Sequence, residues 1–213
     1  MPMLVRTYRD DDFEAVVRAF DATWGWELNT DEAEKHALAA HYVAGAIAAS
    51  NYTRVVENDG HVIGIMCSSI QNMNDARYRV DPVTYLLVVE ETKKRLSRTE
   101  TGREILSFYD RIADINRELE DELRRNAMDW QAEMTLLLCA PDKTCAGVGK
   151  ALVGDLFDFM GQIGVQWCIL KTDTHCAWEY YLKTGWTQAV TKPWKGESDM
   201  RAFAFRKPVT REA

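Results

Sequence analysis

The sequence lacks the features that mark secreted proteins, membrane-spanning proteins and proteins with structural metal sites. Its five cysteines form no CxxC pair, and their odd number argues against a closed disulfide framework. The longest uncharged stretch, residues 36–53, contains two histidines and is too polar and too short for a membrane span. The first residues have no apolar segment after a basic start, so they do not resemble a signal peptide. We therefore expect a cytoplasmic protein with no membrane contact and no metal site.

Positive charge is also scarce. The chain has 26 Lys and Arg residues against 33 Asp and Glu residues, a net charge of -7. A nucleic-acid binder is expected to carry a basic surface, so this class of function is disfavoured. Hydrophobic residues make up 46% and charged residues 28% of the chain, a balance typical of a soluble globular protein with a real core. Its 213 residues fit one domain that carries an insertion.

The apolar pattern alternates short strands with helices. Asn58-Asp59-Gly60 separates two apolar runs and predicts a tight hairpin turn. Asp11 and Glu14 have the spacing of a capping box at the start of the first helix. The run at 133–139 is apolar almost throughout, which predicts a strand buried on both faces. The strands are expected at 4–8, 52–57, 61–70, 133–139, 165–171, 186–191 and 200–206, and the helices at 13–24, 30–50, 147–161 and 177–184.

Residues from about 72 to 129 interrupt this alternation and predict a helical insertion. One helix is expected to contain residues 83–96, and a longer one to run from about 99 to 127, with Ser97 and Glu100 as its capping box. The long helix carries an apolar stripe at helical spacing, formed by Ile105, Phe108, Ile112, Ile115 and Leu119. The stripe has three alternative partners: the chain's own domain, a substrate cleft, or the same surface of a second copy.

The stretch that follows the 133–139 strand has the composition of a phosphate site. The chain bends at Pro141 and enters a helix through Gly147-Val148-Gly149. The first turn of a helix leaves its N–H groups without intrahelical partners, and the helix dipole adds to their attraction for a diphosphate. The segment lacks both the G-x-G-x-x-G spacing of a dinucleotide fold and the G-K-[ST] ending of a P-loop.

A second motif, Ala177-Trp-Glu-Tyr-Tyr-Leu-Lys-Thr-Gly-Trp186, follows the next expected strand. Together the two segments resemble the GNAT superfamily of N-acetyltransferases, whose pattern is a strand, V-x-P-x-x-[RQ]-x-x-G-x-[GA], a helix, another strand, and A-x-x-x-Y-x-x-x-G-[FW]. Cys139-Ala140-Pro141 takes the V-x-P place and Tyr181 takes the tyrosine place. The chain departs from the usual pattern at Thr144, Cys145 and Ala146, where a long polar residue, a glycine and a lysine-like residue are common.

The resemblance implies a mixed α/β fold, with a central, mostly antiparallel sheet flanked by helices. It implies a single domain over residues 1–213, interrupted by the helical insertion at about 72–129. Its activity would be transfer of an acetyl group from acetyl-CoA to a primary amine on a small molecule or peptide, by direct attack in a ternary complex. Tyr181 takes the role of general acid. The cosubstrate-binding residues implied are Leu138, Cys139, Ala140, Thr144, Cys145, Ala146, Gly147, Val148, Gly149 and Lys150.

Several roles stay open at this point. Glu133, acting through water, and His175 are alternative general bases, and Tyr180 is expected to pack in the core. The tryptophan-bearing segments 24–27 and 192–197 suit a cationic amine. An alternative function is a degenerate GNAT fold that binds acyl-CoA as a sensor without turnover. Another is an interaction protein that docks through an exposed apolar stripe on its long helix.

Overall fold

The computed structural model describes residues 3–24, 30–73, 75–78, 80–141, 146–194 and 199–210. Its seven-stranded sheet has the order β1-β2-β3-β4-β5-β7-β6 and is mostly antiparallel, with helices flanking it, so the expected mixed α/β class is confirmed. By its contacts the chain divides into two compact units. Unit 1 comprises residues 1–107 and 135–156, and unit 2 comprises residues 108–134 and 157–213.

The sheet of unit 1 is built on an N-terminal strand and a hairpin. β1 (Leu4–Thr7) pairs antiparallel with β2 (Tyr52–Asn58), which pairs antiparallel with β3 (His61–Ile70). Asp59 and Gly60 of the connecting turn have φ angles of 50° and 79°, the left-handed conformation that a tight hairpin turn requires. The predicted hairpin is therefore confirmed.

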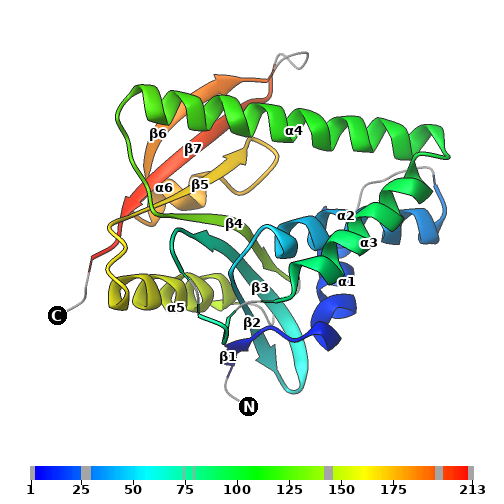
Figure 1. The fold of residues 1–213 in the computed structure, drawn as a ribbon, viewed down its shortest axis with the longest axis horizontal. Helices are drawn as coiled ribbons and strands as arrows, with labels where there is room; N and C mark the ends of the chain where they lie inside the picture. The colour runs from blue at the N-terminus through cyan, green and yellow to red at the C-terminus, as the bar shows by residue number, and fades with distance from the viewer. Residues whose placement is uncertain are drawn as a thin grey trace. The chain divides into compact units, whose positions relative to one another are not determined.

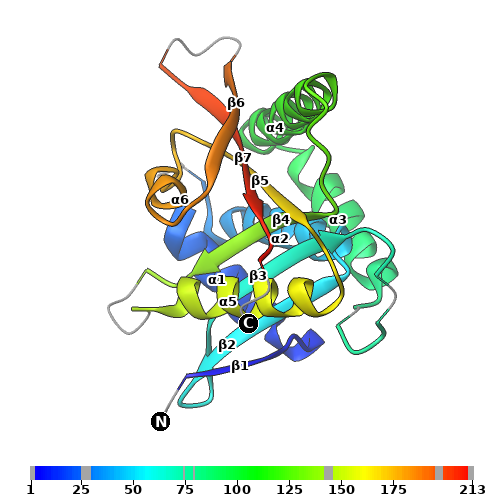
Figure 2. The same cartoon turned by 90° about the vertical axis from the view of Figure 1, so that its left-hand side faces the viewer.

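Helices cover both faces of the unit 1 strands. α1 (Phe13–Trp24) and α2 (Glu32–Ala48) lie on one face, and α5 (Val148–Gln162) lies on the other (Figure 2). The core beneath α1 and α2 includes Val17, Ile47, Val55, Ile65 and Leu138. α3 (Pro82–Leu96) lies alongside α2 (Figure 1).

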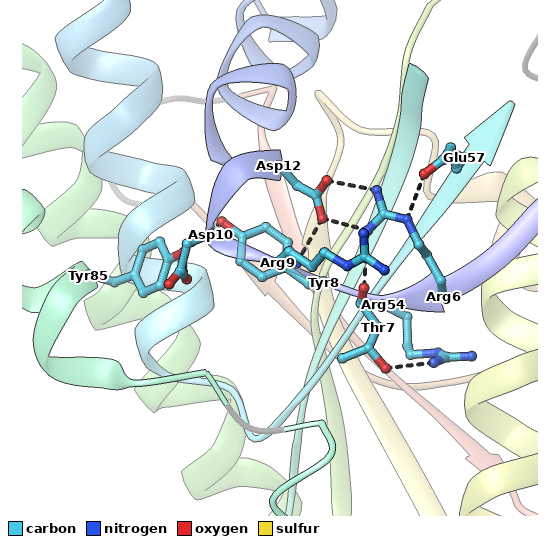
Figure 3. Close-up of polar contacts among 9 residues, drawn as sticks. All are labelled: Arg6, Thr7, Tyr8, Arg9, Asp10, Asp12, Arg54, Glu57 and Tyr85. Carbon is cyan, nitrogen blue, oxygen red and sulfur yellow. Dashed lines mark hydrogen bonds and ion pairs between the residues drawn. The ribbon is translucent and has the colours of Figure 1, made fainter. Parts of the chain in front are cut away.

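An ionic cluster fixes the start of the chain. The Arg6 guanidinium donates hydrogen bonds to both carboxylate oxygens of Asp12, at 2.7 and 2.8 Å, and to Glu57 at 2.7 Å (Figure 3). Burial acts to raise the pKa of the Asp12 carboxyl, but the hydrogen bonds from Arg6 and from the Arg9 N–H outweigh it and leave that pKa below its usual range. The Asp12 carboxylate also accepts the Arg9 N–H at 2.8 Å and so caps the start of the helical segment. The predicted Asp11–Glu14 capping box is therefore wrong.

The strands of unit 2 make one parallel and two antiparallel pairings. β4 (Ala132–Cys139) pairs in parallel with β5 (Trp167–Asp173) through Ala132, Glu133 and Met134. β7 (Arg201–Pro208) pairs antiparallel with β5 and with β6 (Thr187–Pro193), which confirms the expected C-terminal pair. β4 alternates buried and half-buried side chains, so the prediction that both its faces are buried is wrong.

The long inserted helix packs back onto the chain's own sheet. α4 (Glu100–Arg125) buries Ile115, Leu119 and Leu123 against apolar side chains of β5, β6 and β7. Successive residues of β7 point to opposite faces of the sheet. Ala202 and Ala204 lie in the core beneath α4, whereas α6 (Glu179–Lys183) packs on the opposite face, against Phe205. The stripe of α4 is thus buried, which contradicts the docking role that required it to be exposed.

The hydroxyl of Ser97 donates to the Lys93 carbonyl at the end of α3, and Thr99 Oγ1 instead accepts the Gly102 N–H at the start of α4, so the predicted Ser97 cap is wrong. Within the described ranges, no helix combines the length and the apolar character needed to cross a membrane.

Candidate functional site

The turn from β4 into α5 carries the first motif. Gly147 has a φ angle of 88°, a left-handed conformation that side-chain-bearing residues rarely adopt, so glycine is needed at this position. The Ala151 N–H donates to the Gly147 carbonyl at 2.9 Å, which begins the helical hydrogen bonding. Helical geometry consequently leaves the amides of Val148, Gly149 and Lys150 in the first turn without intrahelical acceptors.

The residues of this turn differ in exposure. Ala146 and Lys150 are exposed, so their backbone can be reached from solvent. Val148 is fully buried, so its side chain does not line such a site. Thr144 and Cys145, which the resemblance also assigns to the cosubstrate, lie outside the described residues.

Gly64, which the sequence analysis did not single out, allows α5 to lie close to the sheet. A Cβ atom at Gly64 would lie 2.5 Å from Val148 Cγ1 and 3.0 Å from the Leu138 carbonyl oxygen. Real Cβ atoms essentially never lie as close as 2.5 Å to another heavy atom, so a larger residue at position 64 would force Val148, at the start of α5, to shift. A glycine in the middle of an apolar strand was the only signal of this close approach.

Polar contacts from β2 hold the middle of α5 against the sheet. Asp155 accepts hydrogen bonds from the Tyr52 hydroxyl at 2.5 Å and from Arg54 Nε at 2.9 Å. Burial, reinforced by the bond to Asp155, raises the pKa of the Tyr52 phenol far above its usual value. The phenol therefore stays protonated and keeps donating to Asp155. Sequence reasoning missed this contact because it joins residues distant in the chain.

The end of β4 presents backbone groups on the edge that faces away from β3. The Ala140 N–H donates to the Ile63 carbonyl at 2.9 Å. Because neighbouring residues of an antiparallel strand direct their N–H and C=O groups to opposite sides, those of Cys139 point away from β3. The Thr23 hydroxyl donates to the Cys139 carbonyl at 3.4 Å. Leu138 is buried in the core, so its side chain supports the strand rather than a ligand.

The second motif lies in unit 2, on α6. The Tyr181 ring packs against Trp186, with centroids 5.9 Å apart, and against Phe205 at 5.7 Å. Gly185, the glycine of the motif, has a φ angle of 81°. Tyr180 is 38% exposed, so the expectation that it packs in the core is wrong; Tyr181 is the more enclosed of the two.

Glu133 shares a largely buried lysine with a residue of α4. Lys171 on β5 contacts Glu120, and its Nζ lies 2.9 Å from Glu133 Oε1. Burial raises the pKa of Glu133, and the charge and hydrogen bond of Lys171 only partly oppose this. Burial also acts on Glu120, but its bonds to Lys171 and Arg124 leave its pKa below the usual range. Of the two predicted bases, Glu133 is thus enclosed by charged groups, whereas His175 is exposed.

The tryptophan-bearing segments are only partly described, since residues 25–29 and 195–198 fall outside the described ranges. Trp194 is 5% exposed and stacks on Phe108 of α4, so its ring belongs to the core. Trp24 packs against Phe20 within unit 1. Neither ring is presented openly to a cationic ligand.

Sequence comparisons find no relatives: no family model matches the chain, and no curated protein is detectably similar. Solved structures do match. They include an aminoglycoside 6'-acetyltransferase type Ii (TM-score 0.57, 11% identity, 99% of each chain covered). The PaiA N-acetyltransferase from Thermoplasma acidophilum, in complex with coenzyme A, has a TM-score of 0.53 and 13% identity over 98% of this chain and 99% of that one.

An acetyltransferase of the GNAT family from Bacillus cereus has a TM-score of 0.51 and 9% identity, over 99% of this chain and 100% of that one. These identities are too low to carry an activity, but the coverage includes nearly the whole of each chain. The chain therefore has the fold of the GNAT acetyltransferases.

Proposed function

We propose that this protein transfers an acetyl group from acetyl-CoA to a primary amine of a small molecule or peptide. The observation that carries the proposal is the turn from β4 into α5. There Gly147, in a left-handed conformation, leads into an exposed helical N-terminus at the position of the GNAT motif. The fold and the in-register Tyr181 motif support the same activity.

Backbone groups make most of the proposed cosubstrate site. The amides of Val148, Gly149 and Lys150 bind the diphosphate, helped by the dipole of α5. Thr144, Cys145 and Ala146 complete the loop, and substitution of their side chains matters less because amides do the binding. The pantetheine arm pairs with the backbone of residues 138–140.

The reaction needs no covalent enzyme intermediate. Acetyl-CoA supplies an activated thioester, and the enzyme's main contribution is to hold it beside the amine. The Cys139 N–H donates to the thioester oxygen as negative charge develops there. A new C–N bond forms, the C–S bond breaks, and Tyr181 gives its proton to the departing sulfur. Glu133, whose carboxylate is held by Lys171, accepts the ammonium proton through water.

Binding is tested by titrating the intact protein with acetyl-CoA in a calorimeter, using two variants of Ala146. Ala146→Asp places a negative charge at the helical N-terminus, where it favours the helix dipole but repels a diphosphate. Ala146→Asn has nearly the same shape without the charge. We expect Ala146→Asp to weaken binding at least tenfold relative to Ala146→Asn. Equal affinities, or no binding by the folded wild type, would contradict the site.

Turnover is tested by following free thiol release from acetyl-CoA over a panel of amines. Polyamines, aminoglycosides, amino acids and peptide N-termini cover the acceptor classes. Thiol release that depends on one class identifies the acceptor. Tight acetyl-CoA binding without release for any amine would instead support the alternative, a sensor that binds without turnover.

A further inference from the structure

The outward face of α3 carries an apolar stripe that no described part of the chain covers. Leu87 is 66%, Val83 58% and Leu86 52% exposed, which makes them three of the four most exposed large apolar side chains among the described residues. They occupy positions i, i+3 and i+4 of one helix, so they form a continuous surface. Single exposed apolar residues are ordinary, but a contiguous group on a helix marks an interaction site.

The opposite face of α3 fixes this orientation. Tyr85 is 2% exposed, and its hydroxyl donates to Asp10 Oδ1 at 2.7 Å and lies 2.8 Å from the Tyr8 hydroxyl. Figure 3 shows Tyr85 reaching from α3 toward Asp10 and Tyr8. Farther along, Thr92 contacts His41 Nδ1 at 3.0 Å and Leu96 is fully buried. The leucines therefore point outward because the other face of α3 is anchored.

Charges flank the stripe in a self-complementary way. Asp81 precedes Leu87 by six residues and Lys94 follows it by seven. At 1.5 Å per residue these charges lie about 9 Å and about 10 Å from the leucine along the helix axis. Both are exposed, as are Glu90 and Glu91 between them, and Glu90 and Lys94 lie on the same helical face as Val83 and Leu87.

We propose that the α3 stripe, comprising Asp81, Val83, Leu86, Leu87 and Lys94, is a homodimer interface in which α3 packs antiparallel against α3 of a second copy. A two-fold axis near Leu87 brings the leucines of both copies together and places Asp81 of each copy beside Lys94 of the other. The same surface thus supplies both halves of each ion pair. One 15-residue helix pair is smaller than the interface of an obligate dimer, so the dimer dissociates on dilution.

Sedimentation equilibrium on the intact protein, at concentrations up to about 200 µM, tests the proposal. The wild type is expected to show a monomer–dimer equilibrium. Leu87→Glu is expected to abolish the dimer, whereas Ile163→Glu, which changes a 47% exposed apolar residue elsewhere, is expected to leave it unchanged. A monomeric wild type, whether or not it binds vesicles or another protein, would overturn the proposal, as would equal effects of the two variants.

A charge swap tests the antiparallel register. Lys94→Glu alone sets one carboxylate against the carboxylate of the partner's Asp81, and Asp81→Lys alone sets two cations together; each is expected to weaken the dimer at least tenfold. An equal mixture restores both ion pairs in the heterodimer, so the mixture is expected to associate more tightly than either variant. Thermal melts verify that Asp81→Lys, which also loses the helix cap, remains folded. A mixture no tighter than its components would refute this register.

Discussion

Tyr181 and Tyr180 are neighbours that differ in surroundings, which makes them a matched pair for testing the general acid. Tyr181 packs on Trp186 and Phe205, while Tyr180 is 38% exposed. Phenylalanine at 181 keeps the ring contacts and removes the proton donor. We expect Tyr181→Phe to lower kcat about a hundredfold with little change in acetyl-CoA affinity. Tyr180→Phe should leave kcat unchanged; a similar loss in both variants would contradict the assignment.

At the scale of single residues, the sequence predicted what depends on local spacing and missed what depends on distant contacts. The Asp59–Gly60 turn and the left-handed glycines at 147 and 185 were predictable, because a motif requires them within a few residues. The close approach at Gly64 and the bond from Tyr52 to Asp155 were not, since both appear only when α5 lies on the sheet. The capping box failed for a related reason: Asp12, held by Arg6 of β1, takes the role that the local spacing gave to Asp11.

Among the helices and strands, α4 depends on the lysine that it shares with β4. Lys171 has a side chain only 8% exposed and contacts both Glu120 and Glu133. Lys171→Met would leave two partly buried carboxylates facing each other. We expect a loss of about 2–4 kcal/mol in the free energy of unfolding, measured in urea. Adding Glu120→Gln and Glu133→Gln should recover part of it, whereas a stable Lys171→Met single variant would show that the contact is unimportant.

The helices of the insertion were predicted within a few residues, since their periodicity is strong and needs no tertiary information. Their partner was not predictable: the α4 stripe had three alternatives, and the structure shows it buried against β5, β6 and β7. The prediction for β4 was wrong because an apolar run is typical of a strand buried on both faces. In the structure, the side chains of β4 alternate between a buried and a half-buried face.

At the scale of the whole molecule, the fold was predictable only through two short motifs. The similar structures share 9–13% identity with the chain while covering nearly all of it, so most positions were free to change as long as the apolar pattern stayed. The motifs remained recognisable because they constrain backbone conformation at a few glycines and one tyrosine. The motifs carry no information on an acceptor, which is why the proposed acceptor must be found by experiment.

Stability against pH is a further property of the whole chain. Asp12, Asp75, Glu120 and Glu122 have lowered pKa values, whereas that of Glu133 is raised. A carboxyl with a lowered pKa binds protons more weakly in the folded state, so its stabilisation is present above the unfolded pKa, about 4, and disappears as the pH falls through the folded one. Glu133 acts in the opposite sense. The side chains of Asp75 and Glu122 are 27% and 33% exposed, against 8% for Asp12 and 23% for Glu120, so solvent screens their ion pairs more and we expect Asp12 and Glu120 to contribute more.

We therefore expect the free energy of unfolding to fall steeply below about pH 4, as the unfolded chain takes up protons that the folded one does not. Asp12→Asn isolates the contribution of one carboxyl, because it removes the titrating group that Arg6 and the Arg9 N–H stabilise. In urea titrations from neutral to acid pH, the variant should be less stable by about 2 kcal/mol near neutrality. The two curves should then converge in acid, where Asp12 of the wild type is protonated. A constant difference across the whole pH range would mean that the Asp12 carboxyl does not titrate differently in the folded and unfolded chains.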